Sequence, residues 1–199
     1  MNSKGGIMPP LFNLLLTQLS MKQSENIYLI GLMGAGKTTI GRQLASALRL
    51  PFYDSDKAIE ESTGVDIPTI FEYEGEDGFR NREQAMIAQL TNIEGIVLAT
   101  GGGAILRDEN RKHLQSKGFV VYLQCSIEHI LQRTRRDTQR PLLNTEDPEQ
   151  RLETLFEVRD PLYLSCADFK IDTGELQSKQ VVKDILQAYQ QFNDYPVML

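Results

Sequence analysis

The stretch Gly31-Leu32-Met33-Gly34-Ala35-Gly36-Lys37-Thr38 decides the fold of this chain. It follows an apolar, strand-like run at residues 27–30 and precedes a segment whose apolar residues recur at helical spacing, namely Ile40, Leu44, Ala47 and Leu48. A glycine-rich loop between a strand and a helix points its backbone N–H groups at phosphate oxygens, together with the first turn of the helix. The pattern therefore predicts a phosphate-binding loop, or P-loop, for a nucleoside triphosphate.

Two side chains of this loop carry chemistry of their own. Lys37 supplies a mobile positive charge for the phosphates, and Thr38 supplies a hydroxyl ligand for Mg²⁺. A glycine-rich turn that matches the pattern by accident is the alternative, and the flanking strand and helix argue against it. The predicted nucleotide-binding residues of the loop are Gly34, Ala35, Gly36, Lys37, Thr38 and Thr39.

Length and composition narrow the class of protein. A chain of 199 residues fits one domain, since domains commonly hold about 100 to 200 residues. With 41% hydrophobic and 24% charged residues the chain is typical of a soluble globular protein, and its net charge of −6 argues against a general nucleic-acid binder. Cys125 and Cys166 lie far apart without metal-ligand spacing, so we expect reduced structural thiols and a cytoplasmic location.

Residues 1–25 are expected to form a disordered extension ahead of a single domain at 26–199. The apolar patch at 11–16 is too short to cross a bilayer, which takes about 20 residues, and no convincing signal-peptide cleavage site follows it. We therefore predict no membrane partner. Because Met21 stands just upstream of the first strand, residues 1–20 are interpreted either as this extension or as a mis-assigned start.

Strand-like apolar runs alternate with segments of helical periodicity along the rest of the chain. The predicted strands are 27–30, 51–53, 96–99, 119–123 and 169–171, and the clearest predicted helices are 54–62, 77–90 and 179–189. Such alternation is typical of an α/β fold in which helices cover both faces of a parallel sheet. The polar, arginine-rich stretch 133–148 breaks the pattern, and we interpret it as a lid over the nucleotide site.

Two carboxylates follow the second predicted strand, Asp54 and Asp56. Ligands of open α/β sheets bind at the carboxyl ends of the strands, so one acid is predicted to face Mg²⁺ and the other an acceptor hydroxyl. The alternative, that one of the two only caps the following helix, stays open.

Three further features are candidates for the rest of the site. Arg80 and Glu83 lie at i and i+3 on one predicted helix, where a buried pair would hold the guanidinium ready for a carboxylate. The glycine triplet 101–103 follows the third strand, where a ligand can approach the backbone closely. Arg159 is expected to lie at the end of a helix, with Pro161 marking its stop.

These motifs together, from the P-loop to the helix-end arginine, resemble the shikimate kinase family in order and spacing. The resemblance covers about residues 26–189. It implies a five-stranded parallel sheet with a mobile lid and a monomeric protein. It also implies transfer of the γ-phosphoryl group of ATP to the 3-hydroxyl of shikimate, a step of chorismate and aromatic amino acid biosynthesis.

The resemblance further implies a role for each matched residue on the nucleotide side. Lys37 contacts the β- and γ-phosphates, Thr38 ligates Mg²⁺, and Asp54 helps to hold the metal through its water shell. Arg133 lies against adenine, and Arg140 swings in with the lid to meet the transferring phosphoryl group.

On the acceptor side, the resemblance implies that Asp56 hydrogen-bonds the reacting hydroxyl as a base or an orienting group. Arg80 and Arg159 grip the carboxylate of shikimate, and Glu83 orients Arg80. The backbone of Gly101, Gly102 and Gly103 lines the pocket. The residues implied to be catalytic are Lys37, Asp56 and Arg140.

Two alternative functions stay open at this point. A related small-metabolite kinase such as gluconate kinase would share the P-loop but would not need Arg80, the glycine triplet and Arg159 in this order. A catalytically silent nucleotide-binding homologue would have no chemical need for Lys37, Asp56 and Arg140 together. The expected partners are thus ATP and a small-molecule acceptor, without nucleic acid or membrane.

Overall fold

The computed structural model describes residues 25–134 and 147–194. Its centre is a sheet of five parallel strands in the spatial order β2-β3-β1-β4-β5. The strands are β1 Ile27–Ile30, β2 Phe52–Asp54, β3 Val97–Ala99, β4 Phe119–Gln124 and β5 Phe169–Asp172. The predicted α/β class and five-stranded parallel sheet are therefore confirmed, and every strand ends within one residue of its predicted bounds.

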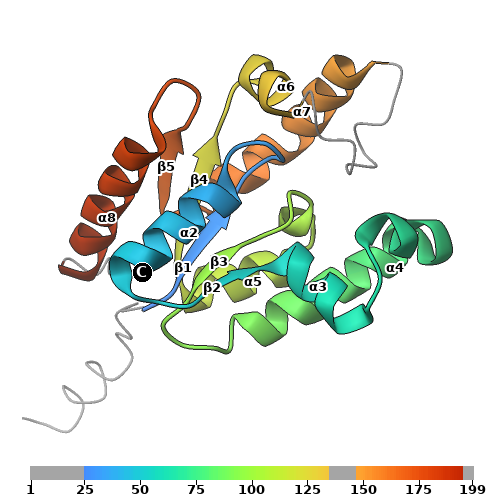
Figure 1. The fold of residues 1–199 in the computed structure, drawn as a ribbon, viewed down its shortest axis with the longest axis horizontal. Helices are drawn as coiled ribbons and strands as arrows, with labels where there is room; N and C mark the ends of the chain where they lie inside the picture. The colour runs from blue at the N-terminus through green and yellow to red at the C-terminus, as the bar shows by residue number, and fades with distance from the viewer. Residues whose placement is uncertain (1–24, 135–146, 195–199) are drawn as a thin grey trace, which may run out of the picture.

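Helices cover both faces of this sheet. They are α2 Lys37–Leu48, α3 Ser55–Thr63, α4 Ile67–Leu90, the short 3₁₀ helix η1 Ala104–Leu106, α5 Asp108–Lys117, α6 Ile127–Thr134, α7 Pro148–Cys166 and α8 Ser178–Asp194. In Figure 1, α2 and α8 lie side by side on one face, and α5 and α7 lie on the other. Helices α3 and α4 pack against each other beyond the β2 edge of the sheet.

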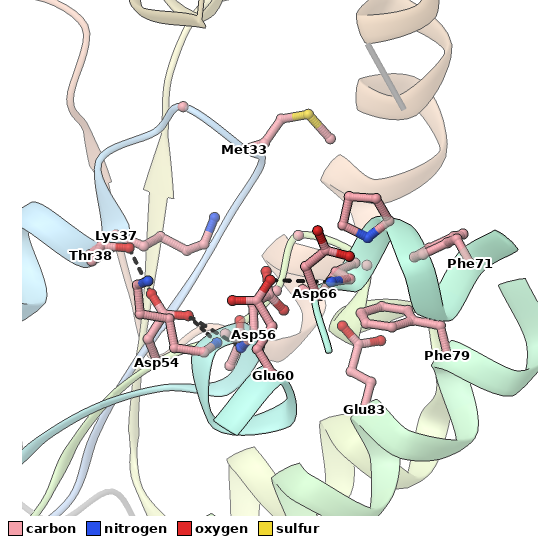
Figure 2. A pocket seen from close by; sticks show the side chains of 18 of the residues that line it. Met33, Lys37, Thr38, Asp54, Asp56, Glu60, Asp66, Phe71, Phe79 and Glu83 are labelled. Atoms are coloured by element: carbon pink, nitrogen blue, oxygen red, sulfur yellow. Dashed lines mark hydrogen bonds between the residues drawn. The ribbon is translucent and has the colours of Figure 1, made fainter. Parts of the chain in front are cut away.

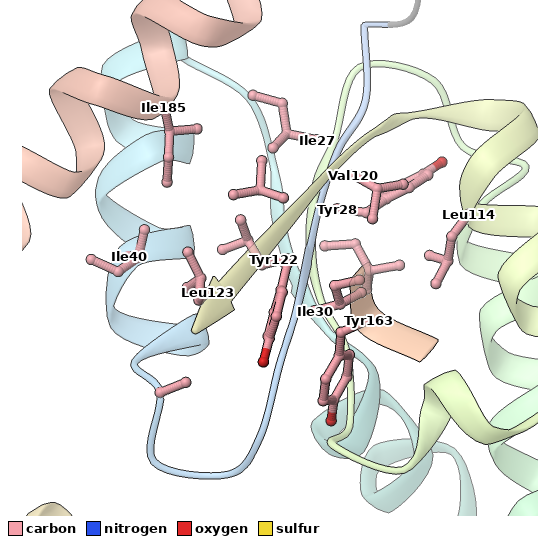
Figure 3. Close-up of a cluster of buried hydrophobic side chains, with 14 of the residues drawn as sticks. Ile27, Tyr28, Ile30, Ile40, Leu114, Val120, Tyr122, Leu123, Tyr163 and Ile185 are labelled. Carbon is pink, nitrogen blue, oxygen red and sulfur yellow. The ribbon is translucent and has the colours of Figure 1, made fainter. Parts of the chain in front are cut away.

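The core consists of two layers of apolar side chains, one on each face of the central strands. Successive residues of a strand point to opposite faces, so strands buried on both sides are apolar, as β1 is and as β4 is up to its last residue, Gln124. Figure 3 shows the two layers: Ile40, Leu123 and Ile185 on one side, and Tyr28, Leu114 and Tyr163 on the other.

Helix α4 begins at Ile67, ahead of the residue 77 predicted from apolar periodicity. Its start is fixed by Asp66, whose side chain accepts a hydrogen bond of 2.9 Å from the backbone N–H of Thr69. The helix is kinked at Gly75, which has φ 70° and ψ −177°. Because only glycine adopts this conformation readily, the kink interrupts the periodicity on which the prediction depended.

Helix α7 continues past Pro161 to Cys166, so the predicted stop at this proline is wrong, and Arg159 lies inside the helix. A proline in a helix interior costs about 3 kcal/mol, because it removes a backbone hydrogen bond and crowds the preceding turn. The turn after the proline buries Tyr163 and Cys166 in the core. Burial of these side chains therefore outweighs the local preference.

Only the two ends of the predicted lid at 133–148 are described. Arg133 and Thr134 belong to α6, and Asp147 caps α7, accepting a hydrogen bond of 3.0 Å from the backbone N–H of Gln150. Arg140 lies outside the described residues, as does the extension predicted at 1–25 except for its last residue. The roles predicted for these segments therefore stay predictions.

Candidate active site

The carboxyl ends of β1, β2 and β3 open onto one cavity of about 670 Å³. Parallel strands end at the same edge of a sheet, so the segments that follow them meet there. Figure 2 shows Lys37, Thr38 and Asp54 at one end of this cavity and Phe71 and Phe79 at the other. The predicted site residues that line it are Gly34, Gly36, Lys37, Thr38, Thr39, Asp54, Asp56, Arg80, Glu83, Gly101, Gly102, Gly103, Arg133 and Arg159.

The side chain of Lys37 is hydrogen-bonded to the backbone of the P-loop. Lys37 Nζ donates hydrogen bonds to the backbone carbonyls of Gly31 at 2.7 Å and Leu32 at 2.8 Å. Ala35 does not line the cavity, but its carbonyl accepts a hydrogen bond of 2.9 Å from Thr173 Oγ1, which ties the loop to the end of β5. The loop therefore has a fixed shape with its ammonium group in place.

Thr38 and Asp54 form a pair of hard oxygen ligands at the start of α2. Thr38 Oγ1 donates a hydrogen bond of 2.8 Å to Asp54 Oδ2. The other oxygen of Asp54 accepts a hydrogen bond of 3.2 Å from the backbone N–H of Asp56 and so caps α3. The capping role that the sequence left open therefore belongs to Asp54, and its role toward a metal stays a prediction. A hydroxyl and a carboxylate suit a small divalent cation that takes its other ligands from phosphates and water.

No cluster of three or more His, Cys, Asp and Glu side chains that could hold a metal ion by itself occurs among the residues described. A metal at Thr38 and Asp54 would depend on the nucleotide for ligands, as Mg²⁺ at phosphates does. The donor set therefore fits a metal that arrives with a triphosphate.

Asp56 and Glu83 bring two enclosed carboxylate oxygens together. Within the described ranges, Asp56 Oδ1 and Glu83 Oε1 are buried and have no hydrogen-bond partner. Burial, with the charges of Glu83 and Asp54, raises the pKa of Asp56 to about 7, although Lys37 and Arg80 act in the opposite direction. Burial also raises the pKa of Glu83. The wall of the cavity thus contains two buried acids whose pKa values are raised.

Two buried guanidinium groups face the same cavity. Arg80, 6% exposed, donates to Glu83 Oε2 at 2.7 Å and to Glu76 Oε1 at 3.0 Å. Arg159 is 3% exposed, and burial and the charge of Arg80 lower its pKa. Arg80 Nε and Arg159 Nη1 have no hydrogen-bond partner within the part of the chain that the structure covers. Two arginines with unused donors suit a carboxylate, which accepts several hydrogen bonds at once.

The glycine triplet is needed for the approach of these side chains. A Cβ atom at Gly101 would lie 2.5 Å from Asp56 Oδ1 and 2.6 Å from Glu83 Oε1. A Cβ atom at Gly103 would collide with the guanidinium group of Arg80. The sequence pattern predicted close approach of a ligand, and the structure shows close approach of the side chains that form the ligand's pocket.

Arg133 lies on the P-loop side of the cavity. It donates a hydrogen bond of 2.6 Å to the carbonyl of Thr173 and one of 3.4 Å to the carbonyl of Gly34. It thus links the P-loop to the segment after β5. Its predicted contact with adenine stays a prediction.

Sequence reasoning missed the wall formed by α3, α4 and the segment between them. Asp66 followed by Pro68 is a signal for a helix start that could have placed this wall, whereas no pattern marked Phe71 as a site residue. The additional residues that line the cavity are Met33, Lys57, Glu60, Asp66, Ile67, Pro68, Phe71, Phe79 and Thr100. The structure therefore brings most of the predicted residues to one cavity, and part of that cavity's wall was not predicted.

None of the helices in the described ranges has the length and apolar character needed to span a membrane.

Comparison with known proteins gives a consistent result. A family model described as "Shikimate kinase" matches residues 33–190. The shikimate kinase of Methylococcus capsulatus is 58% identical over 170 residues, which cover 85% of this chain and 95% of that protein. The shikimate kinase of Pseudomonas entomophila is 58% identical over 167 residues, which cover 84% of this chain and 97% of that protein.

Solved structures agree with these relatives. The shikimate kinase from Acinetobacter baumannii in complex with shikimate is similar with a TM-score of 0.83 and 49% identity, covering 86% of this chain and 96% of that one. The shikimate kinase from Aquifex aeolicus is similar with a TM-score of 0.74 and 36% identity, and the match covers 86% of this chain and 99% of that one. A gluconokinase from Sinorhizobium meliloti is similar with a TM-score of 0.54 and 18% identity, and the match covers 85% of this chain and 93% of that one. This likeness concerns the fold alone.

Proposed function

The chain belongs to the shikimate kinase family, and on that premise we propose that its cavity brings ATP and shikimate together for phosphoryl transfer. The transfer goes from the γ-position of ATP to the 3-hydroxyl of shikimate and gives ADP and shikimate 3-phosphate. One observation carries the proposal. A P-loop shares its cavity with two buried arginines and two enclosed carboxylate oxygens, which suit an acceptor that is both an acid and an alcohol.

On the nucleotide side, Lys37 binds the β- and γ-phosphates from its position in the mouth of the loop. An ATP-using kinase generally needs a divalent metal ion; we propose Mg²⁺, held by Thr38 and through water by Asp54, which when bound neutralises charge on the phosphates. Arg133 is proposed to lie against adenine. Arg140 is proposed to approach the transferring group from the lid.

On the acceptor side, Arg80 and Arg159 bind the carboxylate of shikimate through the N–H groups that have no partner among the described residues. The ion pair with Glu83 fixes the guanidinium plane of Arg80. This arrangement leaves the hydroxyl groups of the ring to face Asp56 and the P-loop, which line the same cavity.

Asp56 is proposed to hydrogen-bond the 3-hydroxyl and to orient it, or to take its proton as the bond to phosphorus forms. A pKa of about 7 suits either role near neutral pH, because the ionised form is accessible and still basic. Phosphoryl transfer needs positioning and charge neutralisation more than covalent chemistry. The lysine, the metal ligands and the aspartate supply both.

We further propose that the protein acts as a monomer in the cytoplasm on these small molecules, without nucleic acid or membrane. The side chains of Cys125 and Cys166 are buried and form no disulfide, which suits the reducing compartment of this proposal.

The test is an ADP-release assay on the purified protein with Mg²⁺ and ATP. We expect release that depends on shikimate and is lost with a metal chelator. Release with gluconate but not with shikimate would overturn the proposal in favour of the gluconate kinase alternative. Absence of release with either acceptor, together with binding of ATP, would identify the silent homologue instead.

A further inference from the structure

Two buried hydroxyl groups hold the glycine triplet from opposite sides. The backbone N–H of Gly101 donates a hydrogen bond of 2.9 Å to Ser55 Oγ, and Tyr163 Oη donates one of 2.5 Å to the carbonyl of Gly102. Ser55 is 0% exposed and Tyr163 is 1% exposed. The triplet is therefore held by two buried side chains.

Each hydroxyl connects the triplet to a segment that carries a site residue. Ser55 stands between Asp54 and Asp56 at the start of α3, and Tyr163 lies one helical turn after Arg159 on α7. The two hydrogen bonds thus join the turn to the hydroxyl-binding acid on one side and to the carboxylate-binding arginine on the other.

The position of Tyr163 is itself fixed by the core of the sheet. Its ring stacks on Tyr122 of β4, with centroids 4.9 Å apart and an interplanar angle of 24°, as Figure 3 shows for these neighbouring rings. Tyr122 Oη in turn donates a hydrogen bond of 2.6 Å to Asp160 Oδ1, next to Arg159. The hydroxyl of Tyr163 is therefore a fixed point for the turn.

The hydrogen bond from Tyr163 sets the direction of one peptide unit in the cavity wall. A trans peptide points its carbonyl and its N–H to opposite sides, so a Gly102 carbonyl directed at Tyr163 directs the Gly103 N–H away from it. In the described part of the chain, no acceptor contacts the N–H of Gly102 or Gly103. Both residues line the cavity, and Gly102 lies between the P-loop at Met33 and the guanidinium of Arg159.

We propose that Ser55 and Tyr163 are positioning residues for the acceptor: their hydroxyls hold the glycine turn in the orientation in which it meets shikimate. Neither needs to touch the substrate. The inference rests on the proposed function and adds to it two residues that act through the backbone of the triplet. Tyr163 also contacts the side chain of Arg159 directly, so Ser55 is the residue that tests the triplet by itself. It predicts that loss of either hydroxyl weakens shikimate binding and leaves ATP binding intact.

The test compares Tyr163→Phe with Tyr28→Phe. Tyr28 is a matched control, because its buried hydroxyl also donates to a backbone carbonyl, that of Lys117, at the opposite end of the sheet. Loss of one positioning hydrogen bond is expected to raise the KM and the Kd for shikimate about five- to tenfold in Tyr163→Phe, with the KM for ATP changed by less than about twofold. Tyr28→Phe should leave both constants at their wild-type values.

Turnover of shikimate by the wild-type protein tests the proposed function separately from this inference. Unchanged shikimate constants in folded Tyr163→Phe would overturn the inference, as would an equal change in Tyr28→Phe or equal rises in KM for both substrates. If Tyr163→Phe does not fold, Ser55→Ala decides the matter. A rise confined to the shikimate constants in Ser55→Ala supports the positioning role, and wild-type constants refute it.

Discussion

Asp56 has a strongly raised pKa at the site. Its pKa is raised to about 7 by burial and by the charges of Glu83 and Asp54, against the opposing effects of Lys37 and Arg80. If the ionised form binds and orients the hydroxyl, kcat/KM for shikimate should fall as the pH drops through about 7, because the carboxylate becomes protonated. Measurement of kcat/KM for shikimate between pH 5 and pH 9 would show this fall on the acid side of the profile.

Asp56→Asn is the matched variant for that profile. It should lower kcat by about 100-fold or more, since general-base catalysis typically contributes that much, and the limb near neutral pH should disappear. A variant with near-normal kcat would remove Asp56 from the chemistry. A limb that persists in the variant would assign the titration to another group.

The same shift predicts how stability depends on pH without substrate. The folded-state pKa of Asp56 lies above the ordinary value of 3.8, so this group favours folding below about pH 4 and opposes it progressively as the pH rises through about 7. Asp56→Asn should therefore gain stability relative to wild type, on the order of 1–3 kcal/mol more at pH 8 than at pH 4. Urea unfolding at the two pH values measures the difference, and equal differences would contradict it.

A substitution at Arg80 can separate the effect of its planar guanidinium group from the effect of its positive charge. Arg80→Lys keeps the positive charge but loses the planar fork, so the KM for shikimate should rise about 10- to 100-fold with the KM for ATP unchanged. Arg82→Lys is the control, because Arg82 lies on the same helix in an exposed ion pair with Glu74. A defect confined to ATP in Arg80→Lys would refute the carboxylate role.

Which site residues could be predicted depends on how local their signal is. Lys37 and Thr38 belong to a contiguous motif, and Asp56 lies two residues after the end of a strand, so their positions in the chain mark them as candidates. Ser55 and Tyr163 act through hydrogen bonds to the triplet, which is distant in sequence, and a hydroxyl next to a motif or in a helix carries no pattern of its own. Their role becomes visible only when the fold brings the partners together.

Helices and strands could likewise be predicted where their signal is local in the sequence, and not where it depends on distant contacts. The central strands β1, β3 and β4 could be predicted because burial on both faces makes them short and almost continuously apolar. The edge strands β2 and β5 are less buried, and their short apolar runs gave a weaker signal. The passage of α7 through Pro161 could not, because it depends on packing of the next turn in the core. The early start of α4 was missed because the kink at Gly75 divides its periodicity in two.

The kink in α4 at Gly75 should affect both stability and substrate binding. The segment before Gly75 places Phe71 in the cavity wall and the segment after it places Arg80, so the kink sets their relative position. Gly75→Ala should destabilise the protein by about 2–3 kcal/mol, since φ 70° with ψ −177° is a conformation that only glycine adopts readily. It should also raise the KM for shikimate, which steady-state kinetics would measure.

Gly64→Ala is the control for this variant. Gly64 also has a positive φ, 74°, and no atom lies within 4 Å of a Cβ built at either glycine, so neither change causes a clash. With ψ 8° Gly64 is in the left-handed helical region, where alanine costs about 1 kcal/mol. It should be the less destabilising change, with a wild-type KM. A shared rise in KM would mean that the kink has no specific role.

For the whole molecule, the acceptor half of the site should stabilise the fold when it is filled. Enclosed oxygens of Asp56 and Glu83 and N–H groups of Arg80 and Arg159 have no partner among the described residues, so a ligand that pairs with them binds the folded state alone. At 100 times its Kd such a ligand adds about 2.7 kcal/mol, which raises Tm by roughly 5–10 °C for a protein of this size. Calorimetry with shikimate alone should show this shift.

A comparison of shikimate with a second hydroxy acid shows whether that Tm shift is specific to shikimate. Gluconate, which also carries a carboxylate and several hydroxyls, should give less than about 1 °C at the same concentration, because an open chain loses more conformational freedom on binding than a ring does. Arg80→Lys should reduce the shift with shikimate while its Tm without ligand stays near wild type. Equal shifts with both acids would mean that the pocket selects charge alone, and the acceptor would then have to be identified by turnover.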